Sequence, residues 1–111
     1  MKKRILYALL VGLLLSPTAI ASAGLRERIW RQDPCLAWIV DHENRSWSPT
    51  QYGLGGSYGL PQAQPSSKMA SAGKDWATNP LTQLRWMRGY VNGRYGGSCN
   101  AKAYWIQHHN Y

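Results

Sequence analysis

The segment Asp33–Asn44 reads DPCLAWIVDHEN and carries the clearest helix signal in this 111-residue chain. An aspartate followed directly by a proline is typical of a helix start, because the aspartate caps free backbone N–H groups and proline needs no donor in the first turn. Apolar residues then recur at helical spacings of three and four: Leu36, Ile39 and Val40. The segment therefore predicts a helix from Pro34 to His42 or Glu43.

Helical patterns also appear on either side of this segment. Leu25–Arg31 is an amphipathic stretch that ends before Pro34, and Asn79-Pro80 repeats the cap-plus-proline start. The second of these helices should run to about Tyr95, where Gly96-Gly97 stops it. Two shorter helices are predicted, at 67–72 with Ser66 as cap and Gly73 as end, and at 101–108 with Asn100 as cap.

Residues 44–60 differ from the helical segments. The part Tyr52–Leu60 holds four glycines and two tyrosines, which predicts turns and a small β-hairpin. Tyr58 takes the last position of a G-x-G-x-x-G pattern, so a nucleotide-binding loop is not supported. The expected fold class is α+β and mostly α.

The first 23 residues have the three parts of a secretory signal peptide. Lys2, Lys3 and Arg4 form the charged start, residues 5–15 are an apolar run, and Ala21-Ser22-Ala23 is a small-residue cleavage site. The apolar run is shorter than the roughly 20 residues of a membrane span. We therefore expect cleavage after Ala23 and a mature domain, residues 24–111, that is secreted or periplasmic and has no membrane span.

The chain is basic, with 13 Lys and Arg against five Asp and Glu and a formal net charge of +8. Removal of the leader lowers this to +5, because three of the basic residues lie in it. An exported cationic protein suits an anionic surface such as a bacterial wall, and nucleic acid is not expected as a partner. Six Trp and seven Tyr argue against intrinsic disorder, and the length fits one domain, expected to be a monomer.

The two cysteines, Cys35 and Cys99, lie near opposite ends of the mature domain. An even count in a small exported chain predicts a disulfide. It would close a loop of roughly 65 residues and stabilise the fold by about 4 kcal/mol in the chain-entropy treatment. The three histidines do not complete a zinc pattern with the cysteines, so we expect no metal and no other cofactor.

Glu43 differs from the other four acidic residues of the mature domain. It follows Ile39 by four residues and Leu36 by seven, so it lies on the apolar side of its predicted helix and at the C-terminal end. Partial burial and the negative end of the helix dipole both raise the pKa of a carboxyl group. A carboxyl that keeps its proton near neutral pH can serve as the general acid in glycoside cleavage. The alternative is a structural glutamate that reaches solvent or a loop amide.

Several short motifs, taken in order, resemble those of soluble lytic transglycosylases and especially of short lysozyme-like domains in secreted and phage proteins. Ala37–Pro49 is similar to the Glu-Ser-x-x-Asn-Pro motif, and Tyr58–Gln62 is similar to the Gly-Leu-x-Gln motif. Further similar pieces follow at Ser67–Ala70, Trp76, Asn79-Pro80 and Arg94–Gly96. The resemblance covers about residues 34–111 and implies a lysozyme-like fold.

The resemblance also implies a function, namely cleavage of the β-1,4 bond between N-acetylmuramic acid and N-acetylglucosamine in peptidoglycan. Glu43 would protonate the glycosidic oxygen and then accept the proton of the muramyl 6-hydroxyl, which closes a 1,6-anhydro ring. Gln62 would help to position the sugar, and Tyr90 would help to orient the acid. Tyr58 and Ser48 are the other predicted substrate-binding residues.

The sequence departs from the family pattern in three places. Asn44 stands where the family has a serine after the glutamate, and Pro61 lies within the Gly-Leu-x-Gln motif. The Ala-Tyr-Asn-Ala-Gly segment of the larger enzymes has no match, and residues 105–111 read WIQHHNY instead. These departures leave one part of the expected cleft unassigned.

Three other functions are alternatives to this one. A hydrolytic lysozyme normally uses two carboxylates, and Asp75 is the one acidic residue after Glu43. The segment 44–64, where a second carboxylate is expected, has none, which favours a mechanism with one acid. A non-catalytic wall-binding module would need no acid at all, whereas a membrane-active cationic protein would need neither capped helices nor a disulfide.

The chain has no Phe, so Trp and Tyr must fill the core as well as any sugar-binding surface. Three aromatic residues of the predicted cleft segment could stack on sugar rings: Trp47, Tyr52 and Tyr58. Three tryptophans on predicted helices are assigned to the core: Trp38, Trp86 and Trp105. His108 and His109 are expected at the surface.

Overall fold

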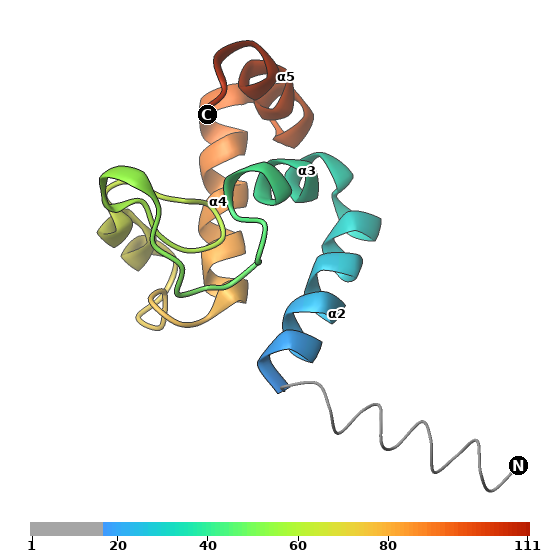
Figure 1. Cartoon of the computed structure of the whole chain (residues 1–111). Helices are drawn as coiled ribbons and strands as arrows, with labels where there is room; N and C mark the ends of the chain where they lie inside the picture. Colours follow the sequence, from blue (N-terminus) through green and yellow to red (C-terminus); the bar gives the residue numbers. More distant parts are fainter. Residues whose placement is uncertain (1–16) are drawn as a thin grey trace, which may run out of the picture.

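The computed structural model describes residues 17–111, with side chains from Gly24 onward, and the fold is mostly helical (Figure 1). Its elements in chain order are α2 (Pro17–Gln32), α3 (Pro34–Glu43), the 3-10 turn η1 (Leu54–Gly56), the 3-10 helix η2 (Ser66–Ala72), α4 (Pro80–Tyr95) and α5 (Ser98–His108). No helix in the described part of the chain is long and apolar enough to cross a membrane. The charged start and apolar run of the predicted leader lie outside the described residues, so cleavage after Ala23 stays a prediction.

Both of the strongest predicted helices begin at the predicted residues. The carboxylate of Asp33 accepts a hydrogen bond from the N–H of Leu36 at 3.1 Å, and a proline follows the cap. Asn79 caps α4 in the same way, accepting from the N–H of Leu81 at 2.9 Å. α4 ends where Gly96 adopts a left-handed φ of 80°, a conformation that glycine tolerates best.

The starts of two shorter helices differ from the prediction. Residues 66–72 form a 3-10 helix preceded by Pro65, and Ser66 is its first residue rather than its cap. Such geometry is common in short helical pieces. α5 begins two residues before Asn100, because the chain is redirected at Gly97. The Asn100 side chain instead donates to the carbonyl of Tyr95 at 2.9 Å, at the end of α4.

The predicted β-hairpin is reduced to two isolated bridges in the described chain, which pair Tyr52 with Tyr58 and Tyr58 with Ala63. No strand forms between residues 17 and 111, so the β part of the predicted α+β class is minimal. The glycine-rich segment is therefore a loop whose shape depends on contacts with the helices.

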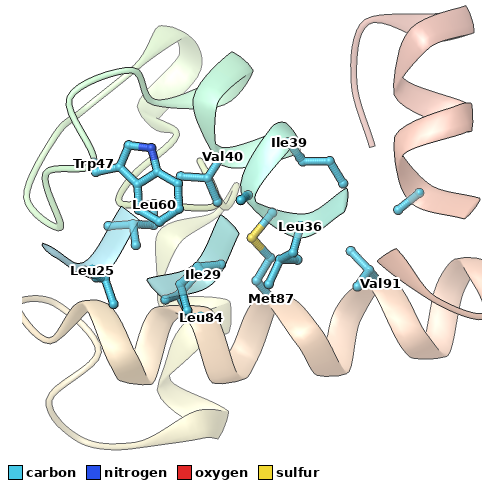
Figure 2. Packing of buried hydrophobic residues seen from close by; sticks show 12 residues of the cluster. Leu25, Ile29, Leu36, Ile39, Val40, Trp47, Leu60, Leu84, Met87 and Val91 are labelled. Atoms are coloured by element: carbon cyan, nitrogen blue, oxygen red, sulfur yellow. The ribbon is translucent and has the colours of Figure 1, made fainter. Parts of the chain in front are cut away.

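The main core lies where α2, α3 and α4 meet, and Figure 2 shows its side chains. Leu36 of α3 and Met87 of α4 are fully buried, and Ile29 brings the short apolar face of α2 against them. The loop adds Trp47 and Leu60 to the same cluster. Trp47 is only 1% exposed, so its predicted role as a sugar-stacking ring is wrong.

The predicted disulfide is present between Cys35 and Cys99, whose Cα atoms are 5.0 Å apart. It joins the first turn of α3 to the first turn of α5. A second link runs beside it, where the Ser98 hydroxyl donates to the Asp33 carboxylate at 2.9 Å. The two links fix α5 against α3, the helix that ends at Glu43.

A buried amide on α4 fastens the glycine-rich loop. Gln83 is fully buried, and its side-chain nitrogen donates to the carbonyls of Pro49 and Trp76, each at 2.8 Å. Its side-chain oxygen accepts from the N–H of Leu60 at 2.9 Å. Gly59 is required beside it, because its φ is 75° and an added Cβ would lie 2.6 Å from the Gln83 oxygen.

Asn44, one of the three departures from the motifs that the chain resembles, supplies the other buried amide. It is fully buried and donates to the carbonyls of Ser48 and Gly59, each at 2.9 Å. It therefore ties the end of α3 to the far side of the loop. Together the two amides hold the loop at a fixed position next to Glu43.

Candidate active site

Glu43 ends α3 and lines a pocket of about 290 Å³. Five parts of the chain form this pocket: the end of α3, the loop 57–64, η2, the middle of α4 and the segment that follows α5. Among the residues that line it, Glu43 is the one acidic side chain and Lys68 the one basic side chain. The pocket thus combines a single carboxyl group with aromatic and amide walls.

Trp105 makes the direct contact with this carboxyl group. Its indole N–H donates to Oε1 of Glu43 at 2.8 Å, from α5. Burial raises the pKa of Glu43, while the bond from Trp105 and the charge of His42 oppose that shift without cancelling it. The pKa of Glu43 is therefore raised, the direction predicted from its place on the apolar side of the helix.

The C-terminal segment forms one wall of the pocket. Tyr111 lies edge-on to Tyr90 with ring centres 5.6 Å apart, and its hydroxyl donates to the carbonyl of Pro61 at 2.7 Å. Burial, with the nearby charge of Glu43, raises the pKa of Tyr111 well above its ordinary value. Sequence reasoning left this segment unassigned, and it supplies Asn110 and Tyr111 to the pocket.

Two of the predicted substrate-binding residues line the pocket with Glu43, namely Gln62 and Tyr90. The side-chain nitrogen of Gln62 donates to the carbonyls of Gly59 at 2.9 Å and Gln51 at 3.2 Å. Its amide is thus held in a defined orientation by the loop. Tyr90 accepts a hydrogen bond on its hydroxyl from Arg94 at 3.1 Å.

The other two predicted residues, Tyr58 and Ser48, do not line this pocket. Tyr58 is 7% exposed, packs in a second small core cluster and donates to the carbonyl of Ala77 at 2.5 Å. In a chain without Phe, this tyrosine fills the interior. The Ser48 hydroxyl lies 3.3 Å from that of Thr50 within the loop, so its contacts are local.

Trp86 is a pocket residue that the sequence reasoning placed in the core. It lines the pocket beside Tyr90, and the two rings are stacked with centres 5.0 Å apart and an angle of 18° between their planes. The two residues are four apart on one helix, so their side chains share a face. That spacing predicts that the two rings lie side by side, but it does not predict that they line a pocket.

The remaining candidate for a second carboxylate, Asp75, forms hydrogen bonds outside the pocket. It accepts from the Thr82 hydroxyl and the Asn79 side chain, each at 2.7 Å, and these bonds lower its pKa. It lies at the start of α4 and does not line the pocket of Glu43.

Asp41, two residues before Glu43, also has a structural role. Its carboxylate pairs with Arg26 at 2.7 Å and accepts from the Trp47 indole at 2.6 Å. Burial raises the pKa of Asp41, but these bonds outweigh burial and hold the pKa below its ordinary value. Glu43 is thus the one acid of residues 24–111 that lines the pocket.

No group of three or more His, Cys, Asp or Glu side chains that could hold a metal ion occurs in the described part of the chain. Comparisons with protein-family models, with curated proteins and with solved structures find no match to this chain. The residues of the pocket and their chemistry are therefore the basis for a functional assignment.

Proposed function

We propose that this chain is an exported peptidoglycan lytic transglycosylase with a lysozyme-like fold, and that Glu43 is its single acid and base. The observation that carries the proposal is a half-buried carboxyl group with a raised pKa, alone among acids in a pocket walled by aromatic and amide side chains. A raised pKa keeps the proton on Glu43 at a pH where an exposed carboxyl has lost it, which general acid catalysis requires.

The proposed reaction needs no second carboxylate. Protonated Glu43 gives its proton to the bridging oxygen as the bond from C1 of N-acetylmuramic acid to that oxygen breaks, so N-acetylglucosamine leaves with a free 4-hydroxyl. The Glu43 carboxylate then accepts the proton of the muramyl 6-hydroxyl, and O6 bonds to C1 to close the 1,6-anhydro ring. The indole N–H of Trp105 stabilises the carboxylate between these two steps.

The position of Asp75 favours this reaction over hydrolysis with two carboxylates. In the two-carboxylate mechanisms the second group lies across the scissile bond from the acid, about 5 to 10 Å away. Asp75 is bound to Asn79 and Thr82 outside the pocket. The substrate's own 6-hydroxyl supplies the nucleophile that the protein does not.

Release of soluble fragments from purified peptidoglycan tests the enzyme assignment. We expect the wild type to release them and Glu43→Gln to release none, because the amide keeps the shape of the side chain but cannot donate and regain a proton. Glu27→Gln is the matched control, since Glu27 is an exposed residue of α2 that does not line the pocket. Equal release by the wild type and Glu43→Gln would refute the role of Glu43, and binding without release would indicate a wall-binding module.

A further inference from the structure

A second hollow, here called the α4 groove, lies next to the pocket of Glu43. It has a volume of about 420 Å³ and is lined by Ser71, Ala72, Arg85, Trp86, Gly89 and Tyr90. Trp86 and Tyr90 line both hollows. The pocket and the groove are therefore contiguous across the two stacked rings.

Gly89 keeps the α4 groove open. It is an exposed residue in the middle of α4, and an added Cβ would have no atom within 4 Å. Glycine inside a helix is unfavourable relative to alanine, and neither crowding nor backbone conformation requires it here. A residue that disfavours the helix is thus found where a side chain would project into the groove.

Arg85 gives one rim of the groove a positive charge. Its guanidinium donates to the carbonyl of Ala72 at 2.8 Å, which holds it at the edge of the groove. The one ion pair among residues 24–111 joins Arg26 to Asp41, so Arg85 has no carboxylate at ion-pair distance, and Asp75 interacts with its charge from farther away. Lys68, on the same η2 segment as Ala72, adds a second cation at the adjoining pocket. The rim thus suits an anionic group.

We propose that the α4 groove binds peptidoglycan next to the cleaved bond, with a sugar face on the Trp86–Tyr90 pair and a stem-peptide carboxylate on Arg85. This inference rests on the proposed function and specifies its substrate as a strand that still carries its peptides. Stacked aromatic faces offer a broad apolar surface to a sugar ring. A guanidinium binds a carboxylate through paired N–H donors, and a strand stripped of its peptides lacks that group.

The groove itself is tested by two glycine substitutions on one helix. Gly89→Leu fills the groove, whereas Gly93→Leu adds the same side chain at an exposed α4 position that is open to solvent and lines neither hollow. Both are made in the Glu43→Gln background, and binding to purified peptidoglycan is measured by co-sedimentation, so no catalysis is needed. We expect Gly89→Leu to weaken binding about tenfold and Gly93→Leu to leave it unchanged. Equal binding by the two variants would overturn the proposal that the α4 groove binds peptidoglycan.

The carboxylate contact is tested by comparing intact peptidoglycan with strands whose peptides an amidase has removed. We expect tighter binding to the intact strands, and we expect Arg85→Gln to reduce this preference by about threefold to tenfold. Arg88→Gln removes the same charge from α4 outside both hollows and should keep the preference. The proposed contact between Arg85 and the stem-peptide carboxylate would be overturned by either of two results. The parent protein could show no preference for intact strands, or Arg85→Gln and Arg88→Gln could reduce that preference equally. If Gly89→Leu weakens binding but the wild-type protein releases no peptidoglycan fragments, the enzyme assignment fails. The binding role of the α4 groove is then still supported.

Discussion

The hydrogen bond from Trp105 to Glu43 joins α5 to the end of α3, and Glu43 lines the pocket. Burial makes the charged form of Glu43 costly, and the indole N–H offsets part of that cost. A carboxyl group held between these two effects can release its proton and regain it. This balance is the property that the proposed reaction uses twice.

Trp105→Phe should shift the pH dependence of cleavage. The phenyl ring retains an aromatic side chain opposite Trp38 but cannot donate to Glu43. Because the lost bond lowers the pKa of Glu43, its removal raises that pKa further and moves the alkaline limb of the rate profile to higher pH. Trp30→Phe is the control, since it removes an indole bond to Asp41 away from the pocket. An unmoved alkaline limb in Trp105→Phe would contradict the assignment.

Glu43→Gln should also change how stability depends on pH. With its pKa raised in the folded state, Glu43 binds its proton more tightly there than in the unfolded chain. Its contribution to stability is present below the ordinary glutamate pKa and is lost as pH rises through the raised value. Glutamine does not titrate, so the melting temperature of Glu43→Gln should rise relative to that of the wild type as the pH increases above the ordinary glutamate pKa. If the melting temperature of the wild type instead rises relative to that of the variant, burial is not the main influence on the pKa of Glu43.

At the scale of elements, the loop 44–64 depends on side chains from the helices beside it. Gln83 of α4 satisfies backbone groups of three residues in the loop and its continuation: Pro49, Leu60 and Trp76. The loop carries Pro61 and Gln62 to the pocket. Its position, and hence one wall of the site, follows from this buried amide.

Gln83→Leu should destabilise the fold by about 3 kcal/mol, because it leaves a buried N–H and two carbonyls without partners at similar side-chain volume. Urea unfolding measures the change. The control is Gln107→Leu on the exposed face of α5, which should change stability by less than about 0.5 kcal/mol. Similar values for the two variants would show that the loop does not depend on Gln83.

Elements with strong local signals were predictable from the sequence. Asp33-Pro34 and Asn79-Pro80 set the starts of α3 and α4, because capping depends on neighbours along the chain. The start of α5 was predicted too late, because it depends on a turn at Gly97 and on a disulfide to another helix. The predicted hairpin did not form strands, since the loop bonds mainly to α4 and to its own turns.

The candidate site was predictable only in part. Glu43, Gln62 and Tyr90 line one pocket, but Trp105 rather than the predicted Tyr90 makes the hydrogen bond to Glu43. Trp38, Trp86 and Trp105 pack against the core as predicted, but helical position alone did not show that Trp86 also faces the pocket. Trp86 and Trp105 contribute to the site, whereas Trp47 and Tyr58 fill the interior.

At the scale of the whole molecule, the disulfide closes the chain over 64 positions and joins α3 to α5. Replacing Cys35 and Cys99 together by serine should lower the free energy of unfolding by about 4 kcal/mol, because the unfolded chain regains the entropy of an open loop. Urea unfolding of the double variant and of the reduced wild type should give similar values. Equal stability of the oxidised and reduced wild type would contradict this role.

The molecule as a whole places one carboxyl group with a raised pKa in a pocket and holds the other acids of residues 24–111 outside it. Under the proposed function, that arrangement favours a one-carboxylate reaction over hydrolysis with two carboxylates. A two-carboxylate enzyme adds water and leaves a reducing end, whereas the proposed reaction uses the 6-hydroxyl and leaves an anhydro end lighter by one water.

Mass spectrometry of the fragments released from purified peptidoglycan tests this account most directly. We predict fragments that end in 1,6-anhydro-N-acetylmuramic acid. Fragments that end in reducing N-acetylmuramic acid would contradict the one-carboxylate mechanism.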